Sequence, residues 1–235
     1  MKIPFLKMIK VPSIGVFVKS VVFFISMVSS ICAFSQTADG VDDGASPYPD
    51  YLEDVFMDME FTQNIMTPEI PSGIQKNITS FQKKTADRLK KQFTIDLMRN
   101  NDVFVICVPT DELFLPNDTL FSIYAESALT PVLDLMKDPY MYKIIVAVHT
   151  DDTGSDKYRE DLSMARLATV YDWMLDAIDA GKISEDLVIV PYSMASAEPL
   201  VNNDTRAHRR QNRRLEFYFI PGPKMIQLAK EHKLK

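Results

Sequence analysis

Two clusters of polar residues in the second half of the chain are the candidates for chemistry. The first runs from His149 to Gly154 and contains Asp151, and a segment with Arg166 follows it after a short turn. On residue types alone, a loop carboxylate and a helix guanidinium form a plain salt bridge, worth about 0 to 1 kcal/mol at a surface. The second cluster, residues 203–214, has six basic or histidine residues within nine positions, which by itself is typical of a solvated face. Binding through charged groups is the chemistry these residues could perform.

The chain offers no candidate for catalysis. No Ser/His/Asp set, Cys/His pair or pair of acid and base carboxylates stands out. His149 and His208 lack metal-ligand spacing, and the loop that contains Asp151 lacks the twelve-residue calcium pattern that ends in Glu. We therefore predict a protein that is not an enzyme, with no catalytic residue, no metal site and no cofactor.

The segments around these clusters alternate between strands and helices. Asp151 follows a predicted strand at its carboxyl end, where open α/β sheets usually bind ligands. In the next predicted helix, Arg159, Ser163 and Arg166 lie at i, i+4 and i+7 and share one polar face. We predict an α/β fold with helices packed on a small mixed sheet. The predicted strands are 103–108, 142–148, 187–192 and 215–220, and the predicted helices are 122–137 and 156–180.

Together the two clusters resemble the OmpA-like peptidoglycan-binding family. The family pattern is approximately G-H-T-D-x-x-G, L-S-x-x-R, N-x-T and R-x-x-N-R-R-V, and Asp111-x-Leu113-Phe114 resembles its opening. The resemblance covers about residues 103–220, and it implies a βαβαββ sandwich. The matching residues are His149, Thr150, Asp151, Gly154, Leu162, Ser163, Arg166, Asn203, Thr205, Arg209, Asn212, Arg213 and Arg214.

The resemblance implies a ligand and the residues that hold it. In that family the ligand is the diaminopimelate residue of peptidoglycan, held by the Asp of the first motif and the Arg of the second, here Asp151 and Arg166. The ligand end is a zwitterion, so the carboxylate would pair with its ammonium and the guanidinium would take its carboxylate through two parallel bonds. Thr150, Asn212 and Arg213 would orient or supplement these groups.

Several positions depart from the family pattern. Val148 stands where Gly is usual, Arg159 where an Asn usually helps to hold the ligand, and His208 replaces another Gly; residues 192–199 also lack the family's Gly-x-Gly. Arg159 and Ser163 are further candidates for ligand contact. The alternative function is therefore a degenerate OmpA-like module that acts as an envelope protein-protein adaptor without binding peptidoglycan.

Arg213 and Arg214 cannot both face a ligand. Successive residues of a strand point to opposite faces of the sheet, so at most one of the two can reach the site. We expect the other to pair with an acid.

Residues 1–35 have the layout of a signal peptide. They contain four lysines and no acid, and the apolar stretch that follows Lys19 is about 15 residues, short of the roughly 20 that span a bilayer. We predict cleavage near Ser35 and a mature protein without a transmembrane span. We expect this protein in the periplasm, associated with the outer membrane or cell wall. Lipidation of Cys32 stays open, although Ile31 before it disfavours it. Cys107 would then be the one remaining cysteine, and we expect it to be buried.

The rest of the chain divides by composition. Residues 36–73 hold nine acids and no Lys or Arg, so we predict an acidic extended linker, or alternatively a docking strip for an envelope protein partner. We predict a lead-in helix over 74–100, the OmpA-like domain over 101–222 and a basic tail over 223–235. Losing four of the 26 basic residues leaves 22 against 32 acids, a formal charge of −10, which disfavours nucleic-acid binding.

Overall fold

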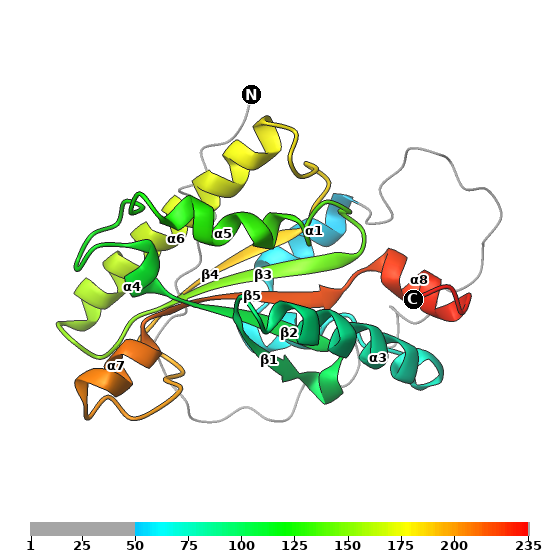
Figure 1. Cartoon of the computed structure of the whole chain (residues 1–235), viewed down its shortest axis with the longest axis horizontal. Coiled ribbons are helices and arrows are strands. Elements are labelled where there is room, and N and C mark those ends of the chain that lie inside the picture. Colours follow the sequence, from blue (N-terminus) through cyan, green and yellow to red (C-terminus); the bar gives the residue numbers. More distant parts are fainter. Residues whose placement is uncertain (1–49, 235) are drawn as a thin grey trace. The chain divides into compact units, whose positions relative to one another are not determined.

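The structure, a computed structural model, describes residues 50–234, so the predicted signal peptide and residues 36–49 lie outside the described residues. Its centre is a five-stranded sheet with the order β1-β2-β5-β3-β4 (Figure 1). Of the neighbouring strand pairs in this sheet, β3 and β4 are parallel and the others are antiparallel, which confirms the predicted small mixed sheet. The strands are β1 (Thr94–Met98), β2 (Val103–Pro109), β3 (Tyr142–His149), β4 (Ile189–Ala195) and β5 (Arg214–Pro221).

Four helices cover one face of the sheet. Alternate residues of the strands, such as Phe104, Ile144 and Phe217, point into this layer and are fully buried. On the longest helix, Leu167, Val170, Met174 and Ala177 recur at helical spacing and pack on the same core, so periodicity fixes which side of the helix meets the sheet. The four helices are α3 (Ser72–Leu89), α5 (Ala125–Leu133), α6 (Asp156–Asp179) and α8 (Pro223–Lys230).

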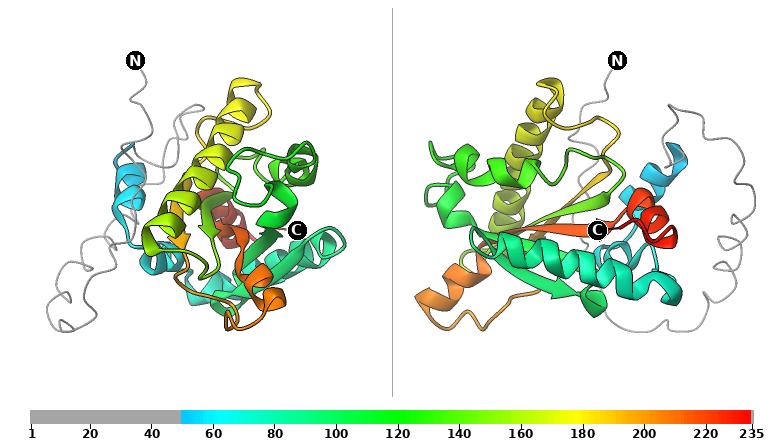
Figure 2. Two further views of the ribbon diagram at one scale, coloured as in Figure 1. Left: turned by 90° about the vertical axis from the view of Figure 1, so that its left-hand side faces the viewer. Right: turned by 45° about the vertical axis from the view of Figure 1, so that its right-hand side comes forward.

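The opposite face is covered by the acidic N-terminal segment. Helices α1 (Asp50–Asp58) and α2 (Phe61–Met66) bury Phe56, Phe61 and Ile65 against this face, away from α3 and α5 (Figure 2). The extended linker predicted over 36–73 is therefore wrong for these residues. In the sequence of this segment, apolar residues stand at helical spacing between the acids. Their packing on the sheet supplies the stability that such short helices lack alone.

A buried lysine ties the end of α2 to the sheet. The Lys143 ammonium donates to the backbone oxygen of Asn64 over 2.7 Å and to its side-chain oxygen over 2.6 Å. It also lies 4.3 Å from the centre of the Phe56 ring, and Arg99 donates to the neighbouring carbonyl of Ile65 over 2.9 Å. Two cations thus bind carbonyls at the C-terminal end of α2, where a helix leaves such groups unpaired.

Two predicted boundaries differ in the structure. The predicted lead-in helix over 74–100 is wrong beyond Leu89, because residues 94–98 form the edge strand β1, where Ile95 and Leu97 alternate inward. The predicted tail contains α8, whose Met225 and Ala229 are buried in the core. The folded unit therefore extends beyond residues 101–222 on both sides.

One end of the sheet gathers the short connecting helices. The helix α4 (Thr110–Leu113) follows β2, α7 (Arg206–Asn212) precedes β5, and α6 begins after the loop that leaves β3 (Figure 1). The backbone N–H of Thr110 donates to the carbonyl of Arg213 over 3.0 Å, which joins the start of α4 to the start of β5. No helix within residues 50–234 is long and apolar enough to cross a membrane.

Candidate functional site

A cavity of about 380 Å³ opens at this end of the sheet. Its walls come from α4 and the loop after it, the loop after β3, the first turns of α6, and α7. The structure brings five of the seven predicted site residues to this cavity and leaves the other two outside it. The five that line it are Thr150, Asp151, Arg159, Arg166 and Arg213.

Asp151 is a buried carboxylate held from both sides. One carboxylate oxygen accepts from the backbone N–H of Thr153 over 2.9 Å, and the other lies 2.6 Å from an Nη atom of Arg213. Burial raises the pKa of Asp151, but these bonds outweigh that effect and hold it below its ordinary value. Asp151 is thus a carboxylate at neutral pH, and an ionised carboxylate has acceptor sites to spare.

Arg166 is a buried guanidinium without a carboxylate partner within residues 50–234. It is 4% exposed, lies 4.9 Å from the centre of the Phe114 ring, and donates to the carbonyls of Asp118 and Leu115 and the hydroxyl of Thr110. These bonds use three of its five N–H groups. Burial lowers its pKa, although nearby carboxylates oppose the effect. Two N–H groups and a desolvated positive charge remain for a ligand.

Arg213 links the two acids of the cavity. Its guanidinium binds Asp111 in two parallel bonds of 2.8 and 2.6 Å while it also contacts Asp151. Hydrogen bonding to Asp111 in particular raises the pKa of Arg213 and lowers that of Asp111. The salt bridge of Asp151 is therefore with Arg213, whereas Arg166 contributes its charge to the cavity.

Asn212 and Ser163 have other partners and do not line the cavity. Asn212 is fully buried, accepts from the backbone of Val201 and donates to the Val201 carbonyl and the Asn203 side chain. Ser163 donates to the Val148 carbonyl over 2.7 Å and accepts from the N–H of Ala195. Both side chains hold backbone segments together around the site.

Arg159 is held by the loop at the cavity rim. Its guanidinium donates to the carbonyls of Asp152 and Gly154 and pairs with Asp156. Thr150 also bonds within the loop, because its hydroxyl donates to the Asp151 carbonyl and its N–H to that of Ala195. The extra charge of Arg159 is therefore partly neutralised before a ligand binds.

The departures from the glycine pattern have distinct structural outcomes. Val148 is an ordinary, fully buried strand residue, which suits its β-branched side chain. The segment without Gly-x-Gly bends through Ala195 at φ 46° and Glu198 at φ 55°, a left-handed conformation that usually favours glycine. This chain accepts backbone strain in this loop where glycines would avoid it.

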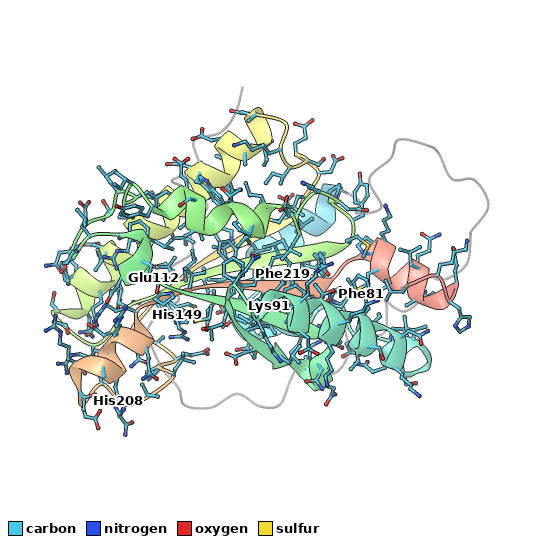
Figure 3. The ribbon with its side chains drawn as sticks, viewed as in Figure 1. Phe81, Lys91, Glu112, His149, His208 and Phe219 are labelled. Atoms are coloured by element: carbon cyan, nitrogen blue, oxygen red, sulfur yellow. The ribbon has the colours of Figure 1, made fainter. Side chains whose placement is uncertain are left out.

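A second polar cluster lies beneath the opposite face of the sheet and was not found from the sequence. Glu216 binds Arg214 over 2.7 Å, accepts from the hydroxyl of Tyr218 over 2.7 Å, and lies 2.9 Å from Nε2 of His149. His149 lies inside the molecule, whereas His208 lies on α7 at the edge of the molecule (Figure 3). Burial raises the pKa of Glu216, but His149 and Arg214 outweigh it and lower the pKa to about 2. Arg214 thus pairs with an acid, as expected, and Arg213 faces the cavity.

Neither cluster has the composition of a metal site. Within residues 50–234, no three His, Cys, Asp or Glu side chains are grouped so that they could hold a metal ion. Asp111, Phe114, Arg206 and Arg209 also line the cavity but were not predicted as site residues. Asp111 and Phe114 follow the first predicted strand, and their place in the family's opening motif was the signal that could have found them.

Comparison with solved structures identifies the fold. A MotB-like protein from Desulfovibrio vulgaris matches with a TM-score of 0.50 and 22% identity over 63% of this chain and 96% of that one. At this identity the match establishes the OmpA-like fold and no more, which confirms the predicted resemblance at that level. No family model and no curated protein sequence matches the chain.

Two further solved structures are similar at lower scores. The cell wall anchor of the type VI secretion system (T6SS) of Pseudomonas aeruginosa matches with a TM-score of 0.41 and 20% identity over 61% of this chain and 96% of that one. The periplasmic domain of Helicobacter pylori MotB matches with a TM-score of 0.44 and 23% identity over 59% of this chain and 88% of that one. None of the three structures is described as an enzyme.

Proposed function

We propose that this protein binds peptidoglycan non-covalently through the diaminopimelate of its peptide stem, and so anchors the outer membrane or an envelope complex to the cell wall. The observation that carries the proposal is the cavity in which a carboxylate, Asp151, and a guanidinium without a carboxylate partner within residues 50–234, Arg166, are both available. The OmpA-like fold supports it, and a solved structure of lower similarity is described as a cell wall anchor.

The charges of the cavity suit a zwitterion in different ways. An isolated buried cation costs free energy, which an incoming carboxylate on Arg166 would offset. Asp151 already pairs with Arg213, so a ligand ammonium would add to this pair and would not replace it. The ligand carboxylate on Arg166 is therefore the contact from which we expect the larger share of the binding free energy.

The adaptor alternative keeps the fold and drops the ligand. It places the partner on the acidic segment or on the basic tail. The buried residues Phe56, Phe61 and Ile65 of the acidic segment already pack on the chain's own sheet. Sedimentation of the protein with purified peptidoglycan sacculi separates the two functions. A peptidoglycan-binding protein should sediment and be released by free diaminopimelate, whereas a protein-only adaptor should remain in the supernatant.

The proposed location is the periplasm, and its support is the signal-peptide pattern of residues 1–35. The mass of the intact protein from its native host tests it. We expect a species that begins near Gln36, and a species that retains Met1 would contradict export by cleavage.

A further inference from the structure

A second cavity of about 740 Å³ adjoins the first on the side of α7. Asp111, Arg206 and Arg213 line both cavities, so the two cavities form one continuous surface. Arg210 lines the second cavity but not the first. We call this second cavity the arginine groove. Arg206 and Arg210 are not among the residues that match the family pattern, and the proposed contacts of Asp151 and Arg166 with diaminopimelate do not use them.

The arginine groove carries more positive charge than its acid can balance. Asp111 is already bound by Arg213 through two short bonds. Arg210 lies 3.8 Å from the same carboxylate and is 62% exposed, and the Arg206 side chain makes no hydrogen bond or ion pair with any residue of the described range 50–234. Arg213 is already bound to both Asp111 and Asp151, so the positive charges of Arg206 and Arg210 are those left for a ligand.

The two arginines are placed differently on the helix that carries them, because Arg206 starts α7, where a positive charge is unfavourable, and Arg210 lies in the last turn, where it is favourable. Arg206 and Arg210 lie at i and i+4 on α7, where like charges destabilise a helix by roughly 0.2 to 0.5 kcal/mol. The helix is instead stabilised at its start, where the Thr205 hydroxyl accepts from the N–H of His208 over 3.0 Å. The two like charges repel each other across one turn, and an anion bound between them would remove the repulsion.

We propose that the arginine groove binds a second carboxylate of the same peptide stem, through Arg206 and Arg210. This inference rests on the proposed function, because the diaminopimelate in the first cavity brings its peptide neighbours to the adjoining groove. A stem that contains diaminopimelate bears further free carboxylates at its γ-linked glutamyl residue and at its C-terminus. The groove thereby selects stems in which one of these carboxylates is free.

Three synthetic stem tetrapeptides, alanyl-γ-glutamyl-diaminopimelyl-alanine, test the inference. The first has all carboxylates free, the second has the glutamyl α-carboxylate as an amide, and the third has the C-terminal carboxylate as an amide. Titration calorimetry measures each against the full-length mature protein, the Arg206→Gln/Arg210→Gln variant and a Lys84→Gln/Arg88→Gln control. The control removes two positive charges from exposed positions of α3, outside both cavities.

We expect the wild-type protein to bind one amidated peptide about twofold to fivefold more weakly than the free one, as exposed ion pairs predict. Whichever amide weakens binding, the glutamyl or the C-terminal one, will identify the carboxylate that the groove binds. The Arg206→Gln/Arg210→Gln variant should bind all three peptides equally, while the control keeps the discrimination. Both arginines are on a surface helix, and an unchanged melting temperature of the variant will show that it folds.

Two results would overturn the inference while the proposed function stands. In the first, the wild-type protein binds all three peptides with the same affinity. In the second, the Arg206→Gln/Arg210→Gln variant still binds an amidated peptide more weakly than the free one. Wild-type protein that binds none of the peptides would instead contradict the proposed function, and the inference with it.

Discussion

Arg166 and Arg214 are buried to the same degree, 4% and 3% exposed, at the same end of the sheet, yet their surroundings differ. Arg214 pairs with Glu216, which is further bound by Tyr218 and approached by His149. Arg166 meets carbonyls, a hydroxyl and an aromatic ring, with no carboxylate among its partners in residues 50–234. One buried charge is balanced within the protein, and the other is not.

The difference separates a structural role from a binding role. A balanced cluster such as that of Glu216 needs nothing from outside, so its loss should affect folding. An unbalanced charge beside a cavity stays costly until a ligand arrives, so its loss should affect binding. The next predictions test whether this division holds.

The largest expected effect is on stability, from Glu216→Ala. It leaves the buried Arg214 without its carboxylate, which typically costs about 3 to 5 kcal/mol in the free energy of unfolding. Urea denaturation of wild type and variant measures the loss. A change below 1 kcal/mol would show that the cluster does not hold the fold.

The same cluster predicts a pH dependence. The pKa of Glu216 is lowered from its ordinary 4.5 to about 2, so the folded state favours the ionised form and the stabilisation is fully present above pH 4.5. It should be lost as the pH falls from about 4.5 towards 2. In that range the stability difference between wild type and Glu216→Gln should shrink, and a constant difference would contradict the assignment.

Second in size is the loss of binding in Arg166→Ala and Asp151→Ala. Removing one half of a desolvated charge contact costs about 2 to 5 kcal/mol, more than a tenfold loss of affinity, so both variants should fail to sediment with sacculi. Arg166→Met keeps much of the packing on Phe114 and should be as stable as the wild type or more so, because the unbalanced charge is gone. Undiminished sedimentation of both alanine variants would mean that the fold has kept no ligand pocket.

An intermediate effect is expected at Asn212, for which sequence and structure indicate different roles. Asn212→Ala removes its bonds to Val201 and Asn203 and should destabilise the protein by about 1 to 3 kcal/mol. The folded variant should keep wild-type affinity for sacculi. Weaker binding without a change in the unfolding midpoint would return Asn212 to the ligand site.

The smallest effect is expected from Arg159→Asn. Arg159 is partly neutralised by Asp156 and the loop carbonyls, so its removal should change stability by less than about 0.5 kcal/mol. If its remaining charge opposes the ligand ammonium, affinity for free diaminopimelate should rise by less than about fivefold. Weaker binding would instead make Arg159 part of the site.

Local pattern in the sequence was enough for the central elements. The strands at 103–109, 142–149 and 214–221 and the helix at 156–179 lie within a few residues of their predicted bounds, because apolar periodicity is a property of neighbouring residues. It failed for residues 50–66 and 94–98. Short helices and an edge strand are stable only against a surface that already exists, so their local signals are weak.

For the candidate site, the sequence by itself determined that Asp151 follows a strand and that Arg166 lies on the next helix. Only the tertiary structure decided their partners. Arg213 is 62 residues from Asp151 and 102 from Asp111, and Glu216 meets His149 on the adjacent strand. Which charge is balanced and which remains free depends on contacts between segments far apart in the sequence, and these arise only when β2, β3 and β5 come together in the folded sheet.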